Sequence, residues 1–264
     1  FDLASVLSRD ENGHLLEDPP ILWEIETDPV LAHTKIIAEA WDAAGLYQVG
    51  SFIGNRWAEW NGKYRDDVRR FVRSDAGLVR SLSSYISGSP NIYTQSGRDP
   101  HRSINFITAH DGFTLNDLVS YNEKHNAANG EDNRDGCNEN FSWNCGVEGP
   151  STDPAVEALR ERQIRNFLTI LMTSQGTPML VMGDEVRRTQ IGNNNAYCQD
   201  NEISWFDWGL VEQNAGLLRF VQELLAFHQE HQVFRARRFW TEPGGPEISW
   251  HGVHLGQPDW NFYS

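Results

Sequence analysis

The sequence is poor in cysteine and has no long apolar run, so we expect neither a disulfide framework nor a transmembrane helix. Its 3 cysteines (Cys137, Cys145 and Cys198) cannot all pair, and none lies in a CxxC motif. We therefore expect free, reduced thiols rather than a disulfide framework or a metal site. No apolar run approaches the roughly 20 residues of a transmembrane helix, and no signal-like segment opens the sequence at Phe1. Cytoplasmic residence is the resulting expectation.

Positive charge is also scarce. The chain has 22 Lys and Arg against 37 Asp and Glu, a net charge of −15 and a pI near 4.9. Nucleic acids and anionic membranes are bound through Lys and Arg surfaces, so we expect neither as a partner. The negative net charge does not oppose the binding of a neutral polymer. At 264 residues the chain is long enough to bury the core of one α/β domain.

Three short apolar runs each deliver a carboxylate at their carboxyl ends. They lead to Asp2, Glu39 and Asp111. Buried strands of parallel sheets read as nearly continuous apolar runs, and in (β/α) barrels the chemistry lies where those strands end. We therefore expect the three acids to face one another across a barrel mouth. Together with 10 tryptophans they indicate glycoside chemistry, which needs one protonated acid and one ionised nucleophile.

Strand and helix patterns alternate along most of the chain, as expected for βαβ units. Pro20 and Pro29 delimit two short helical pieces, and the polar stretch 122–154 is a long loop whose Phe141 and Trp143 favour a site-lining position. Strands are expected at 34–39, 57–60, 103–109 and 177–182. Helices are expected at 64–73, 78–86, 114–119, 155–174 and 216–231.

The predicted fold class is α/β, the C-terminal half of a TIM (β/α)8 barrel. Residues 1–237 form the partial catalytic barrel, from the end of strand four to helix eight. Residues 238–264, with alternating polarity and Pro/Gly punctuation, are expected to begin a truncated β-sandwich domain. The first and last strands then carry open edges, so we expect the chain alone to be marginally stable or prone to aggregation.

The residues around the three acids resemble signature regions of the α-amylase superfamily, glycoside hydrolase family 13. The branch resembled is that of the isoamylases and glycogen-debranching enzymes. The signature stretches are 1–4, 37–42 and 108–113 (FDLA, IAEAWD and TAHDGF), with support from 60–66, 127–131 and 192–201 (WNGKYRD, AANGE and GNNNAYCQDN). The match covers nearly the whole chain and fades after about Arg238. In that family an Arg precedes Phe-Asp, and a further signature region lies upstream, so the missing N-terminal half of the barrel is an expected partner.

The resemblance implies a role for each site residue. Asp2 is the nucleophile, Glu39 the general acid/base and Asp111 the transition-state stabiliser, while His110 binds sugar hydroxyls. The physics agrees, because a Glu flanked by two carboxylates is held protonated, and its pKa falls once one of them is esterified. Retention of configuration is expected, with the Asp2 and Glu39 carboxyls roughly 5 Å apart. The further substrate-binding candidates are Trp41, Trp60 and Asn195.

Each candidate also has a plainer interpretation. A strand-end Asp is often a helix cap, the His110–Asp111 pair is compatible with a structural hydrogen bond, and buried packing is the better interpretation for any single Trp. Asp184 and Glu185 offer ligands for a cation, but an end-of-strand salt bridge is preferred. No metal and no organic cofactor is expected.

The expected function is hydrolysis of α-1,6 branch linkages in glycogen, limit dextrin or amylopectin-like glucans. An α-1,4-acting amylase or transglycosylase is the nearest alternative, because the three acids are common to the superfamily; the stretch 192–201 favours debranching. A non-catalytic, isoamylase-like glucan-binding subunit is the alternative from another class, and intact Asp2, Glu39 and Asp111 count against it. Whether the chain is active alone is left open.

Overall fold

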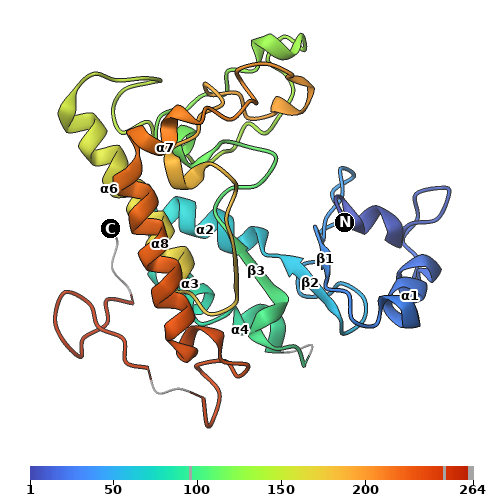
Figure 1. Cartoon of the computed structure of the whole chain (residues 1–264). Coiled ribbons are helices and arrows are strands. Elements are labelled where there is room, and N and C mark those ends of the chain that lie inside the picture. Colours follow the sequence, from blue (N-terminus) through green and yellow to red (C-terminus); the bar gives the residue numbers. More distant parts are fainter. Residues whose placement is uncertain (95–96, 246–247, 261–264) are drawn as a thin grey trace.

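A four-stranded parallel sheet organises the computed structural model, which describes residues 1–94, 97–245 and 248–260. The sheet order follows the chain, β1-β2-β3-β4, and Figure 1 shows the strands with the helices beside them. Helices join β2 to β3 and β3 to β4, whereas the connection between β1 and β2, residues 39–56, contains no helix. Sequential parallel neighbours with helical crossovers are typical of a (β/α) barrel, so the predicted partial barrel is confirmed. The strands are β1 (Ile36–Ala38), β2 (Trp57–Trp60), β3 (Ser103–Phe106) and β4 (Thr177–Met179).

Phe1 continues the sheet on the outer side of β1. The Phe1 amino group donates to the carbonyl of Ile37, and the Glu39 N–H donates to the carbonyl of Phe1, both at 2.9 Å. When one residue donates a hydrogen bond to position i−1 of the neighbouring strand and accepts one from position i+1, the two strands form a parallel bridge. Here the residue is Phe1, and i is Ala38. Phe1 thus occupies a strand position, as the sequence predicted, and Asp2 follows at the carboxyl end of the sheet.

The start of α6 is fixed by a side-chain cap and a proline. Asp153 caps α6 by accepting a 2.8 Å bond from the Ala155 N–H, and Pro154 fills the first helical position, where it loses no hydrogen bond. The helices are α1 (Pro20–Thr27), α2 (Gly62–Val72), α3 (Val79–Ile86), α4 (Pro90–Tyr93), α5 (Leu115–Leu118), α6 (Pro154–Thr173), α7 (Gly209–Gln213) and α8 (Ala215–Glu230).

Two hydrophobic clusters hold these elements together. In the larger one, helices α2, α6 and α8 bury Val68, Phe167 and Val221 against one another. The smaller cluster surrounds Trp57, which is fully buried with Phe52 and Leu22. Figure 1 shows α6 and α8 side by side, with the N-terminal segment and α1 beyond β1 at the other end of the sheet.

All four strands that follow Phe1 and the long helices agree with the sequence prediction, but the C-terminal stretch does not. Within 239–245 and 248–260 the structure has turns and a single isolated bridge, His254 to Gln257, in place of the expected strands. Residues 246–247 and 261–264 lie outside the described residues, and the domain boundary at 238 stays a prediction. Helices α4 and α7 were not expected, and β3 ends three residues before Ala109.

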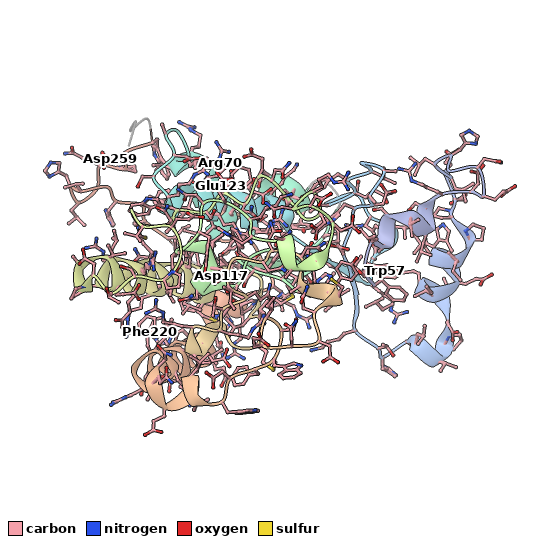
Figure 2. The ribbon with its side chains drawn as sticks, turned by 90° about the horizontal axis from the view of Figure 1, so that it is seen from above. Trp57, Arg70, Asp117, Glu123, Phe220 and Asp259 are labelled. Carbon is pink, nitrogen blue, oxygen red and sulfur yellow. The ribbon has the colours of Figure 1, made fainter. Side chains whose placement is uncertain are left out.

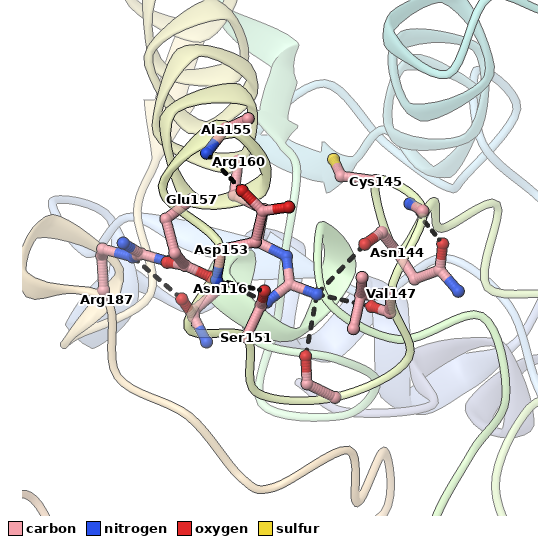
Figure 3. Close-up of polar contacts among 12 residues, drawn as sticks. Asn116, Asn144, Cys145, Val147, Ser151, Asp153, Ala155, Glu157, Arg160 and Arg187 are labelled. Atoms are coloured by element: carbon pink, nitrogen blue, oxygen red, sulfur yellow. Dashed lines mark hydrogen bonds and ion pairs between the residues drawn. The ribbon is translucent and has the colours of Figure 1, made fainter.

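The long loop between α5 and α6 is tied to one buried guanidinium (Figure 3). Arg160 is 1% exposed, and its Nη2 atom donates to the carbonyls of Asn144, Val147 and Gly149 at 3.1, 2.5 and 2.8 Å. Its Nη1 atom pairs with Glu157 at 2.9 Å. Because a side chain of the following helix binds three loop carbonyls, residues 144–149 are fixed against α6.

Among the residues that the structure describes, no helix combines the length and the apolar character that crossing a bilayer requires.

Candidate active site

Glu39 stands at the carboxyl end of β1 and is held by the first residues of the chain. Its side chain is nearly inaccessible, at 3% exposed, and its Oε2 atom accepts a 2.5 Å bond from the Leu3 N–H. The Glu39 carbonyl in turn accepts a 2.9 Å bond from the Ala4 N–H. Leu3 adopts a left-handed conformation with φ 45°, which turns the chain immediately after Asp2. The Asp2 and Glu39 side chains therefore lie side by side.

The two carboxyls have opposite pKa shifts. Burial, a hydrogen bond with Asp2, and the charges of Asp2 and Asp111 raise the pKa of Glu39 to about 7, against the opposing effect of the Leu3 N–H. The hydrogen bond with Glu39 and the nearby charge of His110 lower the pKa of Asp2, although burial opposes them. At neutral pH the pair thus offers one carboxyl that retains a proton and one carboxylate, the combination that acid and nucleophilic catalysis require.

His110 connects this pair to the third acid. Its Nε2 atom lies 3.6 Å from Asp2 Oδ1, and its Nδ1 atom lies 3.9 Å from Asp111 Oδ1. The side chains of Asp2, His110 and Asp111 are 68%, 56% and 55% exposed, so a ligand can reach all of them. The structure thus brings together three acids that lie up to 109 residues apart in sequence, 111 − 2; their catalytic roles stay predictions.

The two candidate tryptophans have different surroundings. The Trp60 ring lies 5.6 Å from the His110 ring and 5.4 Å from Phe106, which places it beside the acids. Trp41 stacks on Tyr47 with ring centroids 5.8 Å apart and an angle of 7°, and Arg65 lies 6.0 Å from its ring. These contacts favour packing for Trp41 and leave Trp60 as the better candidate for a sugar contact.

Asn195 does not hydrogen-bond to any of the acids within the described residues. Its Nδ2 atom donates to Asp135 Oδ2 at 2.9 Å, and its carbonyl accepts a 2.9 Å bond from Asn129. The preceding residue, Asn194, contacts the residue next to an acid, because its carbonyl accepts a 2.9 Å bond from the N–H of Gly112, which follows Asp111. The predicted substrate contact of Asn195 stays a prediction.

Sequence reasoning missed two charged residues at this end of the sheet. Arg9 Nε pairs with Asp42 Oδ2 at 2.6 Å and so connects the segment after Asp2 to the end of β1. Arg65 lies over the ring of Phe106 at 5.5 Å and pairs with Asp66 at 2.7 Å. Burial opposes its charge, but the charge and hydrogen bond of Asp66, and then the charge of Asp111, raise its pKa. The stretch 60–66 contains Arg65 and was noted for its resemblance, but no pattern identified this one cation.

The expected salt bridge at Asp184 is absent among the described residues. Asp184 is 1% exposed and accepts hydrogen bonds from the Thr108 hydroxyl and, at 2.9 Å, from the Leu115 N–H. Burial raises its pKa to about 6. Glu185 binds the Gly183 N–H at 2.8 Å. No group of His, Cys, Asp and Glu suited to a metal ion occurs in the described part of the chain.

A cavity of about 460 Å³ lies away from the acids, among the first residues of the strands. Ile36, Ala58, Ile104 and Thr177 contribute to its wall, and none of the acids does. Since barrel chemistry lies at the opposite, carboxyl end of the strands, the acids and not this cavity are the candidate active site.

Known proteins share this chain's sequence over a limited part of their length. No family model matches it. The glycogen operon protein GlgX homolog of Mycobacterium tuberculosis is 52% identical over 98% of this chain and 37% of its own length. Isoamylase 3, chloroplastic, of Oryza sativa subsp. japonica is 52% identical over 95% of this chain and 32% of its own length. The chain therefore spans about a third of the length of these relatives.

A solved structure supports the fold. Pullulanase type I from Bacillus subtilis str. 168, in complex with maltose, aligns with a TM-score of 0.64 and 20% identity. The alignment covers 90% of this chain and 31% of the pullulanase.

Proposed function

We propose that this chain is the part of a retaining glycoside hydrolase that carries the catalytic acids, because its relatives are named as a glycogen operon protein GlgX homolog, an isoamylase and, in Serratia proteamaculans, a glycogen debranching enzyme. The proposed reaction is hydrolysis of α-1,6 branch linkages in glycogen or a related α-glucan. One observation carries the proposal: a buried Glu39, with its pKa raised to about 7, lies beside an Asp2 whose pKa is lowered.

The proposed mechanism has two displacements. In the first, the Asp2 carboxylate attacks the anomeric carbon while Glu39 donates its proton to the departing glycosidic oxygen, giving a glycosyl ester and a free sugar hydroxyl. Esterification removes the charge of Asp2, so the pKa of Glu39 falls and Glu39 becomes a base. In the second, Glu39 takes a proton from water, the hydroxide oxygen bonds to the anomeric carbon, and Asp2 leaves as carboxylate. Two inversions give net retention.

The other residues act around the same sugar ring in this proposal. Asp111 is exposed beside His110, where a carboxylate stabilises the positive anomeric carbon of the transition state. His110 lies between Asp2 and Asp111 and offers a ring N–H to the sugar hydroxyls. Trp60, packed on His110, is the candidate for an apolar contact with the sugar face.

Linkage selectivity rests on the relatives and not on the acids. The same acid set serves α-1,4 and α-1,6 chemistry, and the names of the relatives favour debranching. We propose a neutral α-glucan as substrate partner, in keeping with the net charge of −15. Cytoplasmic residence stays a prediction, and the rice relative is named as chloroplastic.

Digestion of glycogen and pullulan by the full-length gene product tests the proposal. We expect linear maltodextrins from glycogen and maltotriose units from pullulan, with the α-anomer formed first. Shortened linear chains without loss of branch points would point to an α-1,4-acting enzyme. Glucan binding without any cleavage would point to a non-catalytic subunit.

A further inference from the structure

We propose that Asn194 is a positioning residue, which holds Asp111 in place through the main chain of Gly112. The inference rests on the proposed function, because it concerns the placement of one of the three acids. In this role, a residue of the Asn-rich stretch 192–201 supports catalysis without contacting the substrate.

Asp111 depends on its main chain for its position. Its side chain is 55% exposed, and its closest ion-pair contact within the described residues is His110, at 3.9 Å. No hydrogen bond from a described residue fixes its carboxylate. Because few contacts hold the Asp111 side chain, the position of its carboxylate depends on the position of the Asp111 main chain.

The next residue, Gly112, anchors that backbone. Its N–H donates to the Asn194 carbonyl at 2.9 Å, and its carbonyl accepts a longer bond, 3.4 Å, from Gln190 Nε2. Gly112 has φ +87°, a conformation that suits glycine and turns the chain sharply after Asp111. Both polar groups of the Gly112 main chain are therefore bonded to the segment 190–194.

The side chain of Asn194 is fixed in its turn. It is 1% exposed, its Oδ1 atom accepts a 2.8 Å bond from Asn126, and its Nδ2 atom donates to Asn140 Oδ1 at 2.8 Å and to the Cys137 carbonyl at 2.7 Å. The Asn194 N–H donates to Asn126 Oδ1 at 3.0 Å. Every polar group of this residue is paired, and a flipped amide would face two acceptors with its oxygen.

The surroundings admit little displacement of Asn194. A Cβ added to Gly136 would lie 2.2 Å from Asn194 Oδ1, so the long loop packs directly on the amide. On the other side, the buried Asp117 carboxylate, labelled in Figure 2, accepts bonds from the N–H groups of Gln190 at 2.7 Å and Gly192 at 3.3 Å. The segment 190–194 is thus held both by the long loop and by Asp117, and its hydrogen bonds to Gly112 restrict the movement of Gly112 as well.

The test compares Asn194→Ala with a matched control, Asn105→Ala, in the full-length gene product. Asn105 is also a fully buried amide, and it donates to the Gln175 carbonyl at 3.0 Å near the amino ends of the strands. We expect both variants to lose stability. Only Asn194→Ala should lose kcat, by about 10- to 100-fold with KM nearly unchanged, because small misplacements of a catalytic group are costly.

The pH profile separates positioning from a general loss of structure. The groups that act electrostatically on Glu39 are Asp2 and Asp111, while His110 and the Phe1 amino group act on Asp2. Displacing Asp111 removes one of the charges that raise the pKa of Glu39, so the basic limb of the kcat/KM profile should move to lower pH. Asp111→Asn should move it in the same direction, and Asn105→Ala should leave it in place.

Two further variants keep the test decisive if Asn194→Ala does not fold. Asn140→Ala removes one acceptor of the Asn194 amide, and Gly136→Ala presses on its oxygen; either should reproduce the kcat loss and the shifted limb. If the wild type is active and the variants keep both its kcat per folded molecule and the position of its basic limb, the inference about Asn194 is overturned and the proposed function stands. An inactive wild type would instead remove the proposed function.

Discussion

The main-chain N–H of Leu3 donates a 2.5 Å hydrogen bond to the carboxyl of Glu39, across a separation of 36 residues. This bond favours the ionised form of Glu39, whereas burial and Asp2 favour the protonated form, and the latter prevail because the pKa is raised to about 7. The contact fixes the acid/base candidate against the candidate nucleophile, and the first three predictions follow from it.

Glu39→Gln should reduce kcat of the full-length gene product by at least about 10³-fold while leaving glucan binding nearly unchanged, because Gln keeps the shape but has no proton to donate. Steady-state kinetics and affinity electrophoresis in glycogen gels measure the two effects. Glu185→Gln is the matched control, a Glu in the short 3-10 helix after β4 that is bonded to the Gly183 N–H, and it should retain activity. Retained turnover in Glu39→Gln would remove Glu39 from its role.

Activity should fall as the pH rises through about 7, since the reactive form has Glu39 protonated and Asp2 ionised. The glucan itself carries no titratable group, so the limb belongs to the enzyme. The measurement is kcat/KM between pH 4 and 9 for wild type and Glu185→Gln, which should share this limb. A flat profile across neutral pH would contradict the assignment.

Glu39→Gln should be more stable than wild type at alkaline pH. The folded-state pKa of Glu39, about 7, exceeds its ordinary value of 4.5, so the folded protein binds this proton more tightly than the unfolded chain. Its stabilising contribution is complete below about 4.5 and is lost as the pH rises to about 7. At pH 8.5 the variant should gain on the order of 3 kcal/mol in the free energy of unfolding, and little at pH 4. Urea titrations at both pH values measure it, and equal gains at the two would contradict it.

Arg160→Met should lower the free energy of unfolding by about 3 kcal/mol, because it strips donors from three loop carbonyls. Arg162→Met, two residues along α6 at an exposed position, is the control and should change stability by less than about 0.5 kcal/mol. Thermal unfolding compares the two. Similar losses would show that the buried guanidinium does not hold the loop.

Local patterns in the sequence predicted the elements of the fold. Apolar runs predicted β1 and β2, and apolar residues at helical spacing predicted α6, at 155–174. These signals are readable because strand burial and helical periodicity depend on residues close together in the chain. The same reasoning failed at 239–260, where alternating polarity did not become strands, because alternation alone supplies no pairing partner.

By itself, the sequence determined which apolar runs form strands, and so which acids, Asp2, Glu39 and Asp111, follow the strands at one end of the sheet. Only the tertiary structure decided where β3 and β4 end and how the acids interact: that Glu39 is buried against Leu3, that His110 lies between two carboxylates, and that Asn194 rather than Asn195 bonds to Gly112, the residue after Asp111. The reason is physical. The existence of a strand follows from local hydrophobic periodicity, whereas burial, pKa shifts and amide networks depend on loops that are distant in sequence and meet only in the folded chain.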